Sequence, residues 1–377
     1  MNKTLSFILL FIFINSSVIA TFNPVLASET SGDYWNTKTP MKQARHGLGV
    51  VAADSKIYAI GGFATDGNVV NTNERYDPKF DTWVTLEPML TPRAWFAITA
   101  CQGKIYCMGG TIYDKMERVT FGINEVYDTV TDSWSTKASL PYNGSTVQAN
   151  VVDDTIFVII DGQNLYMYDP TNDTWTKKAD LPETPTGGAL FASTVVGGKI
   201  IVTGDFSVEN PHNVYRYQKV FIYDSKANRW SEGKTGPVVV QFCVVGATTG
   251  IYAAPKVYVL GLVYDSFSSV KVANQVYNPV GDSWLSAKAL PTNRVDFGVA
   301  VVDDILYVIG GYTSTDLASI GGTVNSSALT EQYVPTGYTG TLPLVNLTAS
   351  ESKPSSTYYC GCISFNGWNC CGSFFLS

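Results

Sequence analysis

The chain is poor in the residues on which most catalytic and metal sites depend. Only two of its 377 residues are histidines, His46 and His212, and their separation fits no metal-ligand spacing. The GxSxG, HExxH and P-loop patterns are also absent from the sequence. We therefore expect no metal, no cofactor and no catalytic residues, and an enzyme is the less favoured interpretation.

Charged residues are scarce as well. Asp, Glu, Lys and Arg together make up 15% of the chain, the net charge is −7, and no run of like charges occurs. A nucleic-acid-binding surface needs a basic patch, and an anionic membrane surface repels an acidic protein. The composition thus argues against nucleic acid and membrane surfaces as partners. An aromatic content of 13% with so little charge indicates a sheet-rich chain.

A long apolar run occurs at the N-terminus. Residues 5–14 are apolar apart from one serine, a lysine precedes them, and small residues would permit cleavage after Ala20 or Ala27. This is the layout of a secretory signal peptide. A membrane anchor is the alternative, but Asn, Ser and Pro residues interrupt the run well short of the ~20 apolar residues that a span needs. We predict a signal peptide over residues 1–27, a secreted, extracellular protein, and no stable membrane span.

The most informative pattern is a Tyr followed seven positions later by a Trp, which recurs five times. A sixth Tyr, Tyr333, has no such Trp, but Trp35 precedes the first repeat in the sequence context that follows the other tryptophans. Self-similarity at this period is typical of propellers and solenoids. The chain is therefore a closed ring of six units that is cut inside one of them. The five complete pairs are Tyr76/Trp83, Tyr127/Trp134, Tyr168/Trp175, Tyr223/Trp230 and Tyr277/Trp284.

Each unit has the pattern of four short strands. In the first unit, apolar runs at 47–53 and 57–60 are separated by a turn, and the second run ends at Gly61-Gly62. Two more strands follow, one containing Tyr76 and one starting at Trp83. Short runs rich in Val, Ile, Tyr and Trp and bounded by Gly, Asp and Pro are strands joined by hairpins. The Gly pair permits a positive φ where the second strand ends.

These marks resemble the kelch-repeat family, over roughly residues 33 to 340. The resemblance implies an all-β, six-bladed kelch-type β-propeller over residues 28–340, with the last blade closed by the N-terminal strand around Trp35. The Gly pair is kept in blades 1, 2 and 6, whereas blades 3, 4 and 5 have Asp161-Gly162, Gly204-Asp205 and Gly261-Leu262.

In kelch-like propellers the usual binding surface is the face where the chain enters each innermost strand. Arg45, Arg93 and Arg294 stand just before the inner strands of three blades, so we expect them to point toward the axis and form a positive rim. His46 and Arg216 are the other predicted ligand-binding residues of this rim. Alternatively, each Arg binds neighbouring loop carbonyls and only shapes the rim.

The loops after the second strands of the blades are predicted to be unequal. Blade 3 has almost no loop, at Asp161–Asn164, whereas Thr111–Gly122, Asp205–Gln218 and Tyr312–Ala328 are long. Binding residues concentrate on such loops when a rigid scaffold holds them. Length drift between repeats is the alternative.

The sequence thus favours a monomeric, secreted binding module for an extracellular protein, peptide or glycan. An acidic ligand would suit the three arginines. The alternative is a small sugar isomerase resembling the kelch-type sialic acid mutarotases. That function would require an Arg to converge with a carboxylate or a His at the channel mouth. A purely structural repeat protein is a third hypothesis and predicts no defined pocket.

The seven cysteines fall into two groups. Cys101, Cys107 and Cys243 lie in predicted strands and are expected to be buried free thiols. The other four lie in a predicted linker and Cys-rich tail over residues 341–377, and in an oxidising compartment we expect them to form disulfides, with the connectivity open. A soft-metal site is the rival, but CxxC spacing is absent. These four are Cys360, Cys362, Cys370 and Cys371.

Four sequons make the chain a candidate glycoprotein. An Asn-X-Ser/Thr tripeptide is an acceptor for N-glycosylation when it lies on the surface of a secreted protein. Such tripeptides also arise by chance in chains rich in Asn and Thr. The candidate acceptors are Asn143, Asn172, Asn325 and Asn346.

Overall fold

The structure is a computed structural model that describes residues 32–114, 117–186, 191–210, 213–264, 270–313 and 325–342. The chain divides into two compact units, Met1–Pro343 and Leu344–Ser377, and every described residue belongs to the first. The predicted signal peptide, His212, Asn346 and the four tail cysteines lie outside the described residues. In the described ranges, no helix is long and apolar enough to cross a membrane.

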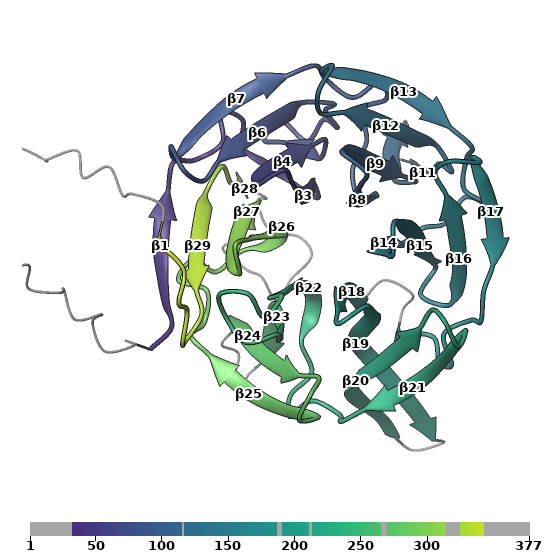
Figure 1. Cartoon of the computed structure of the whole chain (residues 1–377), viewed down its shortest axis with the longest axis vertical. Helices are drawn as coiled ribbons and strands as arrows, with labels where there is room; N and C mark the ends of the chain where they lie inside the picture. Colours follow the sequence, from purple (N-terminus) through teal and green to yellow (C-terminus); the bar gives the residue numbers. More distant parts are fainter. Residues whose placement is uncertain are drawn as a thin grey trace, which may run out of the picture. The chain divides into compact units, whose positions relative to one another are not determined.

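Six antiparallel sheets surround a central channel (Figure 1), which confirms the predicted all-β, six-bladed propeller. From the innermost strand outward, the blades consist of β3 (Gly49–Ala53), β4 (Lys56–Ile60), β6 (Asn73–Asp77) and β7 (Thr82–Leu86) in blade 1; β8 (Ala97–Cys101), β9 (Lys104–Met108), β12 (Asn124–Asp128) and β13 (Ser133–Lys137) in blade 2; β14 (Val147–Val152), β15 (Thr155–Ile160), β16 (Asn164–Asp169) and β17 (Thr174–Lys177) in blade 3; β18 (Phe191–Val196), β19 (Lys199–Asn210), β20 (Asn213–Asp224) and β21 (Arg229–Gly233) in blade 4; β22 (Gln241–Ala247), β23 (Val257–Tyr264), β24 (Val270–Asn278) and β25 (Ser283–Ala287) in blade 5; and β26 (Val295–Val302), β27 (Ile305–Thr313), β29 (Thr330–Val334) and β1 (Tyr34–Lys38) in blade 6.

Short additional strands lie on the face of the propeller where the inner strands begin. The strand β2 pairs with β5, β10 forms a hairpin with β11, and β28 lies beside β27. All of them belong to segments that lead into an inner strand or follow a second strand. Their bounds are β2 (Arg45–His46), β5 (Phe63–Ala64), β10 (Thr111–Asp114), β11 (Glu117–Thr120) and β28 (Asn325–Ser326).

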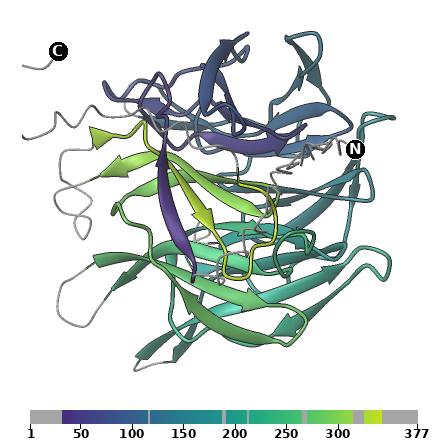
Figure 2. The same ribbon diagram turned by 60° about the vertical axis from the view of Figure 1, so that its left-hand side comes forward.

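The ring closes in blade 6, where both ends of the propeller meet. The strand β1 lies beside β29 (Figure 2). The two strands are antiparallel, and their register places Trp35 directly opposite Tyr333. The centres of the two rings are 4.9 Å apart, within the 4.7–5.2 Å found for the Tyr/Trp pairs of the other blades. The predicted closure by the N-terminal strand is thereby confirmed, and β29 has a strand on both of its sides.

The repeated Tyr and Trp tie each blade to the one before it. In blade 1 the hydroxyl of Tyr76 donates to Asp81 (2.6 Å), and the same carboxylate accepts the backbone N–H of Thr39 from blade 6 (2.9 Å). The indole of Trp83 donates to the carbonyl of Thr39 (2.8 Å). The same three bonds recur in every blade. The residue equivalent to Asp81 is Asp132, Asp173, Asn228, Asp282 and Asp33 in blades 2 to 6.

The hydrophobic core lies between blades rather than at the axis. Buried apolar side chains of the described residues form six clusters, one between each pair of neighbouring blades. Between blades 6 and 1, for example, Ile57 and Ala59 pack with Tyr307 and Ile309, all fully or almost fully buried. Alternate residues of each sheet thus face one neighbour or the other, which is the period-2 pattern of strands buried on both faces.

The second strand ends just before the Gly pair in blades 1 and 2, whereas in blade 6 β27 continues through Gly310-Gly311 to Thr313. In blade 1, Gly61 and Gly62 have φ of 62° and 96°, and β4 stops just before them. In blade 4 the degraded pair Gly204-Asp205 lies inside β19, and the ladder continues with Asp205 opposite Gln218. The predicted loop over 205–218 was therefore wrong, because this segment is an extended β-hairpin. Thr111–Gly122 also contains a hairpin, β10–β11.

The three cysteines of the propeller are buried and free, as predicted. Cys101 pairs with Lys104 across the β8–β9 hairpin, and Cys243 lies in the inner strand β22. Burial raises the pKa of the thiols of Cys101, Cys107 and Cys243 to about 11, 12 and 12. They therefore remain protonated and act as small apolar core residues.

Candidate functional site

The three predicted rim arginines do not face the channel. Arg45, Arg93 and Arg294 are all 0% exposed, and each is paired with a buried glutamate on the third strand of its own blade. Other guanidinium N–H groups of each arginine donate to backbone carbonyls within the blade, whereas the buried Nε of each has no hydrogen-bond partner. The ion pairs join Arg45 to Glu74 at 2.8 Å, Arg93 to Glu125 at 2.7 Å and Arg294 to Glu331 at 2.7 Å.

The expectation of a positive rim was therefore wrong. A charge held within 3 Å of an opposite charge and shielded from water contributes little field at the channel. The glutamates could have been found in the sequence, because each stands two positions before the repeated Tyr. In blades 3, 4 and 5, which lack the Arg, the same position holds Tyr166, Phe221 and Gln275.

His46 and Arg216 occupy different places. His46 in β2 stacks on Phe63 (5.1 Å between ring centres), and its Nδ1 lies 2.9 Å from the hydroxyl of Ser326. Burial lowers the pKa of His46 to about 4, so its ring is neutral at physiological pH. Arg216 in β20 forms an ion pair with the buried Asp205 of β19. Neither residue is brought together with the three arginines.

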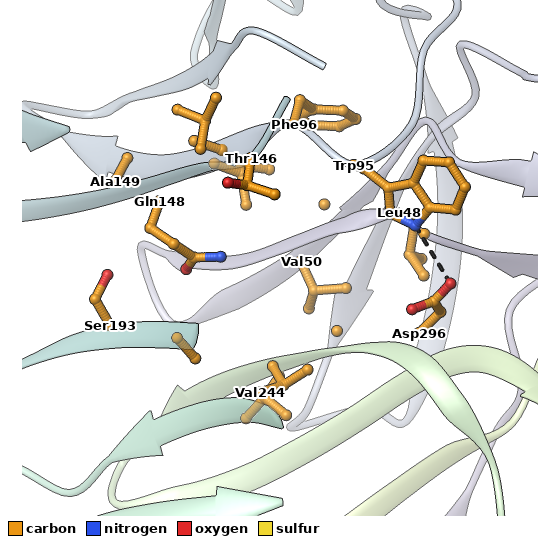
Figure 3. A pocket seen from close by; sticks show the side chains of 18 of the residues that line it. Leu48, Val50, Trp95, Phe96, Thr146, Gln148, Ala149, Ser193, Val244 and Asp296 are labelled. Atoms are coloured by element: carbon orange, nitrogen blue, oxygen red, sulfur yellow. Dashed lines mark hydrogen bonds between the residues drawn. The ribbon is translucent and has the colours of Figure 1, made fainter. Parts of the chain in front are cut away.

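The main cavity of the described part is the channel itself, with a volume of about 450 Å³. The inner strands of all six blades line it, mostly with small apolar side chains such as Val50, Ala149 and Val244 (Figure 3). Gln148 and Ser193 add polar groups to the wall. This volume falls within the ~300–1,000 Å³ of small-molecule sites.

Equivalent residues of the repeats form the mouth of this cavity. In blades 1, 2 and 6 this residue stands two positions after the Arg, and in blades 3 and 5 it occupies the equivalent place, where the chain enters the inner strand. All of these residues line the cavity. We call them the mouth residues; the described ones are Gly47, Trp95, Thr146, Phe242 and Asp296.

The backbone of the mouth is strained. Trp95, Phe242 and Asp296 have φ of 51°, 49° and 53°, in the left-handed region that side chains other than Gly seldom adopt. Phe242 sits at an irregularity in the β22–β23 ladder. Such residues cost of order 1–3 kcal/mol each and cluster at functional sites. The mouth is therefore the first candidate for a site of function.

A chain of hydrogen bonds joins the mouth residues of blades 6, 1 and 2. The N–H of Gly47 donates to the carbonyl of Asp296, and the N–H of Trp95 donates to the carbonyl of Gly47, both at 2.9 Å. The indole of Trp95 also donates to the Asp296 carboxylate at 3.3 Å (Figure 3). A Cβ on Gly47 would lie 2.8 Å from the indole nitrogen, so only Gly lets Trp95 cross blade 1. Burial raises the pKa of Asp296.

Arg118 brings a positive charge to the same mouth. It projects from β11, and its guanidinium lies 5.4 Å from the centre of the Trp95 ring. It donates to the carbonyl of Ser145 (2.8 Å) and to the hydroxyl of Thr111 (3.3 Å). The sequence placed Arg118 only within the predicted loop Thr111–Gly122, because its pattern did not show that a β-hairpin would bring Arg118 to the cavity.

Trp95 also separates the channel from a second, smaller cavity of about 240 Å³. His46, Phe63 and Ser326 line this cavity, and the rings of Phe63 and Trp95 are 4.7 Å apart. Across the described ranges, no group of three or more His, Cys, Asp or Glu side chains is arranged to hold a metal ion.

Three of the four sequons lie among the described residues, and the side chains of all three are exposed. Asn143 stands two residues before Ser145 at the mouth, and Asn325 directly precedes Ser326. Asn172 lies in a hairpin turn and donates to Asp169 at 2.7 Å. Their glycosylation stays a prediction.

The fold and its repeated residues define a six-bladed propeller of the kelch type. The family pattern described as "Kelch motif" matches residues 44–90, 92–141 and 293–327, which fall in blades 1, 2 and 6. The three motifs and the six-bladed arrangement together support a kelch-repeat β-propeller. The three matched blades, 1, 2 and 6, are also the ones that keep the Gly pair and the Arg–Glu ion pair.

Among solved structures, the chain is similar to one entitled "Structure of YjhT". The two share 14% sequence identity with a TM-score of 0.61, over 78% of this chain and 95% of the other. At this identity the likeness concerns the fold alone. A comparison with curated protein sequences gave no match.

Proposed function

We propose that this protein is a secreted binding module whose channel mouth holds an extracellular ligand. The observation that carries the proposal is the strained mouth, where Trp95, Phe242 and Asp296 border one cavity. Strain of this kind persists where a function needs the side chain in that place. The apolar N-terminal run, typical of a signal peptide, supports secretion.

The ligand need not be acidic. The three buried arginines are neutralised by their glutamates, so the positive rim that favoured an acidic partner is missing. What the mouth offers instead is one cation, one carboxylate and two large aromatic rings. Aromatic residues supply much of the energy in binding sites, because they bury a large area at a small cost in entropy.

Array binding of the purified chain from residue 28 onward tests this function. The chain is presented to arrays of extracellular glycans and peptides, alongside Trp95→Ala and Phe80→Ala variants. Phe80 is 60% exposed in an outer hairpin turn, so its loss controls for non-specific stickiness. We expect binding that Trp95→Ala weakens at least tenfold and Phe80→Ala leaves unchanged. Binding to nothing, or equal binding by all three proteins, would contradict the proposal.

A small sugar isomerase is the second candidate, and one observation favours it. Arg118 and Asp296 both line the mouth, which supplies the arginine and carboxylate that such a function requires. The raised pKa of Asp296 would suit a general acid or base. Exchange between the anomers of N-acetylneuraminic acid, followed by ¹H NMR, tests it. A rate that matches that of an Asp296→Asn variant would exclude this function.

A further inference from the structure

The two aromatic mouth residues come from opposite sides of the channel. Trp95 precedes β8 in blade 2, and Phe242 lies in β22 of blade 5. In a ring of six, the second and fifth blades are diametrically opposed, and Figure 1 shows β8 and β22 on opposite sides of the channel. Since both side chains line the same cavity, a ligand that enters the mouth passes between them.

The backbone of the repeat does not require an aromatic residue at the mouth position, and the Trp95 ring reaches Phe63 and Asp296 from there. The equivalent residue of blade 1 is Gly47, which adopts φ of 60° without strain, so the repeat itself accepts Gly at this place. An L-residue there costs about 1–2 kcal/mol. Phe242 is in addition 43% exposed, so only part of its apolar surface is buried and stabilises the fold. Two strained aromatic residues facing one cavity point to a ligand that uses their rings.

The charges at the mouth do not favour an ion. The charged side chains among the described residues that line the cavity are Arg118 and Asp296, of opposite sign. Arg118 is already bound to the carbonyl of Ser145, and one oxygen of Asp296 accepts the indole N–H of Trp95. An anion would meet Asp296, and a cation would meet Arg118. The site therefore suits an uncharged ligand.

The remaining polar groups suit a ligand that carries hydroxyls. The amide of Gln148, the hydroxyl of Ser193 and the carboxylate of Asp296 lie around the cavity in Figure 3. Between them they donate and accept hydrogen bonds, and a sugar hydroxyl can do both. The C–H face of a pyranose ring packs on the electron-rich face of an aromatic ring.

Resting on the binding function proposed above, we propose that the mouth holds one uncharged saccharide residue at the end of a glycan. Its ring lies between Trp95 and Phe242, and its hydroxyls bind Asp296 and Gln148. The six inner strands surround the cavity on all sides, so a ligand enters it along the axis of the ring. A terminal residue therefore fits this site better than the middle of a polymer.

Titration of the chain from residue 28 onward with simple glycosides tests this inference. The probes are the methyl glycosides of glucose, galactose, mannose and N-acetylglucosamine, with N-acetylneuraminic acid as a charged comparison, followed by saturation-transfer NMR and calorimetry. We expect at least one uncharged glycoside to bind, and Trp95→Ala or Phe242→Ala to weaken it at least tenfold. Phe80→Ala and Asp66→Asn, at exposed sites outside the mouth, are the matched controls and should change nothing.

The outcomes separate this inference from the general binding function. If no uncharged glycoside binds while a peptide or an acidic glycan is retained through Trp95, the saccharide inference is overturned and the binding function stands. If a glycoside binds equally well to both aromatic variants, the proposed placement is wrong. Should either Ala variant fail to fold, Phe242→Gly keeps the test available, because Gly accepts the backbone conformation found there.

Discussion

The carboxylate of Asp33 accepts a hydrogen bond of 2.7 Å from the hydroxyl of Tyr333, 300 positions further along the chain. The same carboxylate accepts the N–H of Lys288 from blade 5, and the indole of Trp35 donates to the carbonyl of Lys288. Blade 6 thus receives from the N-terminus the same contacts that every other blade makes with its own residues. The stability of the ring depends on these few residues at its seam.

Removing the seam should open the ring. Deletion of residues 28–40 removes β1 with its ladder to β29. We expect the melting temperature to fall by at least about 10 °C, because the deletion removes a whole strand and the contacts at the seam, although 1 kcal/mol shifts the melting temperature of a long chain by only ~2 °C. Deletion of residues 28–32 is the matched control, because it leaves Asp33 and Trp35 in place. Thermal unfolding followed by circular dichroism measures both. Equal melting of the longer deletion and the intact chain would disprove closure by β1.

The buried ion pairs should matter for stability and not for binding. Glu74→Gln leaves the guanidinium of Arg45 buried without its counter-charge, and we expect a loss of ~3–5 kcal/mol. Asp77→Asn is the control on the same strand, because its partner Lys56 is partly exposed and such pairs contribute ~0–1 kcal/mol. Urea unfolding measures the difference. Weaker ligand binding by a folded Glu74→Gln protein would instead indicate that Arg45 takes part in binding.

A mutation at the mouth should separate stability from function. Phe242→Gly relieves a positive φ but also removes the buried part of a side chain that is 43% exposed, and since these two effects are of similar size and opposite sign we expect the melting temperature to change by only about 2 °C. Binding at the mouth should fall at least tenfold in the same protein. Calorimetry gives both quantities. A large loss of stability would show that Phe242 is a packing residue, and that its strained backbone serves the fold.

His46 should make the protein sensitive to acid. Its pKa is lowered in the folded state to about 4, whereas an unfolded His titrates near 6.5, so the unfolded chain binds a proton first. His46 therefore contributes no penalty above pH 6.5 and destabilises the fold increasingly as the pH falls toward 4. A His46→Gln variant should show a shallower loss of stability between pH 6.5 and 4. Parallel pH profiles for the two proteins would contradict this assignment.

The cysteines should behave as two classes. Cys101, Cys107 and Cys243 should resist alkylation in the native protein and react only after unfolding, because their thiols are buried and protonated. Mass mapping without reductant should find the four tail cysteines oxidised. Truncation after Leu342 should leave the melting temperature unchanged, since the blades close without the tail. Free thiols throughout the tail would favour the metal-site alternative.

Much of the fold could be predicted because it repeats. The Tyr and Trp of each unit are cross-strand partners, so their spacing of seven encodes a hairpin of fixed register. The displaced Trp35 revealed the split blade for the same reason. The residue two positions before each Trp completes the contact between blades, and it is Asp in five blades and Asn228 in blade 4. Its role could not be predicted from the sequence, because its partner belongs to the neighbouring blade.

The candidate site was harder to predict because it depends on contacts between blades. The sequence alone determined the number of blades, their order and the seam, since these follow from local strand patterns and a repeat. The direction of each side chain was decided by tertiary structure. Arg45 turned inward because Glu74 lies within its reach in the same blade, and Trp95 turned toward Asp296 because Gly47 leaves room between them. The direction of these side chains depends on which groups lie next to each other in the folded ring. The sequence pattern does not contain the distances between residues of different strands and blades.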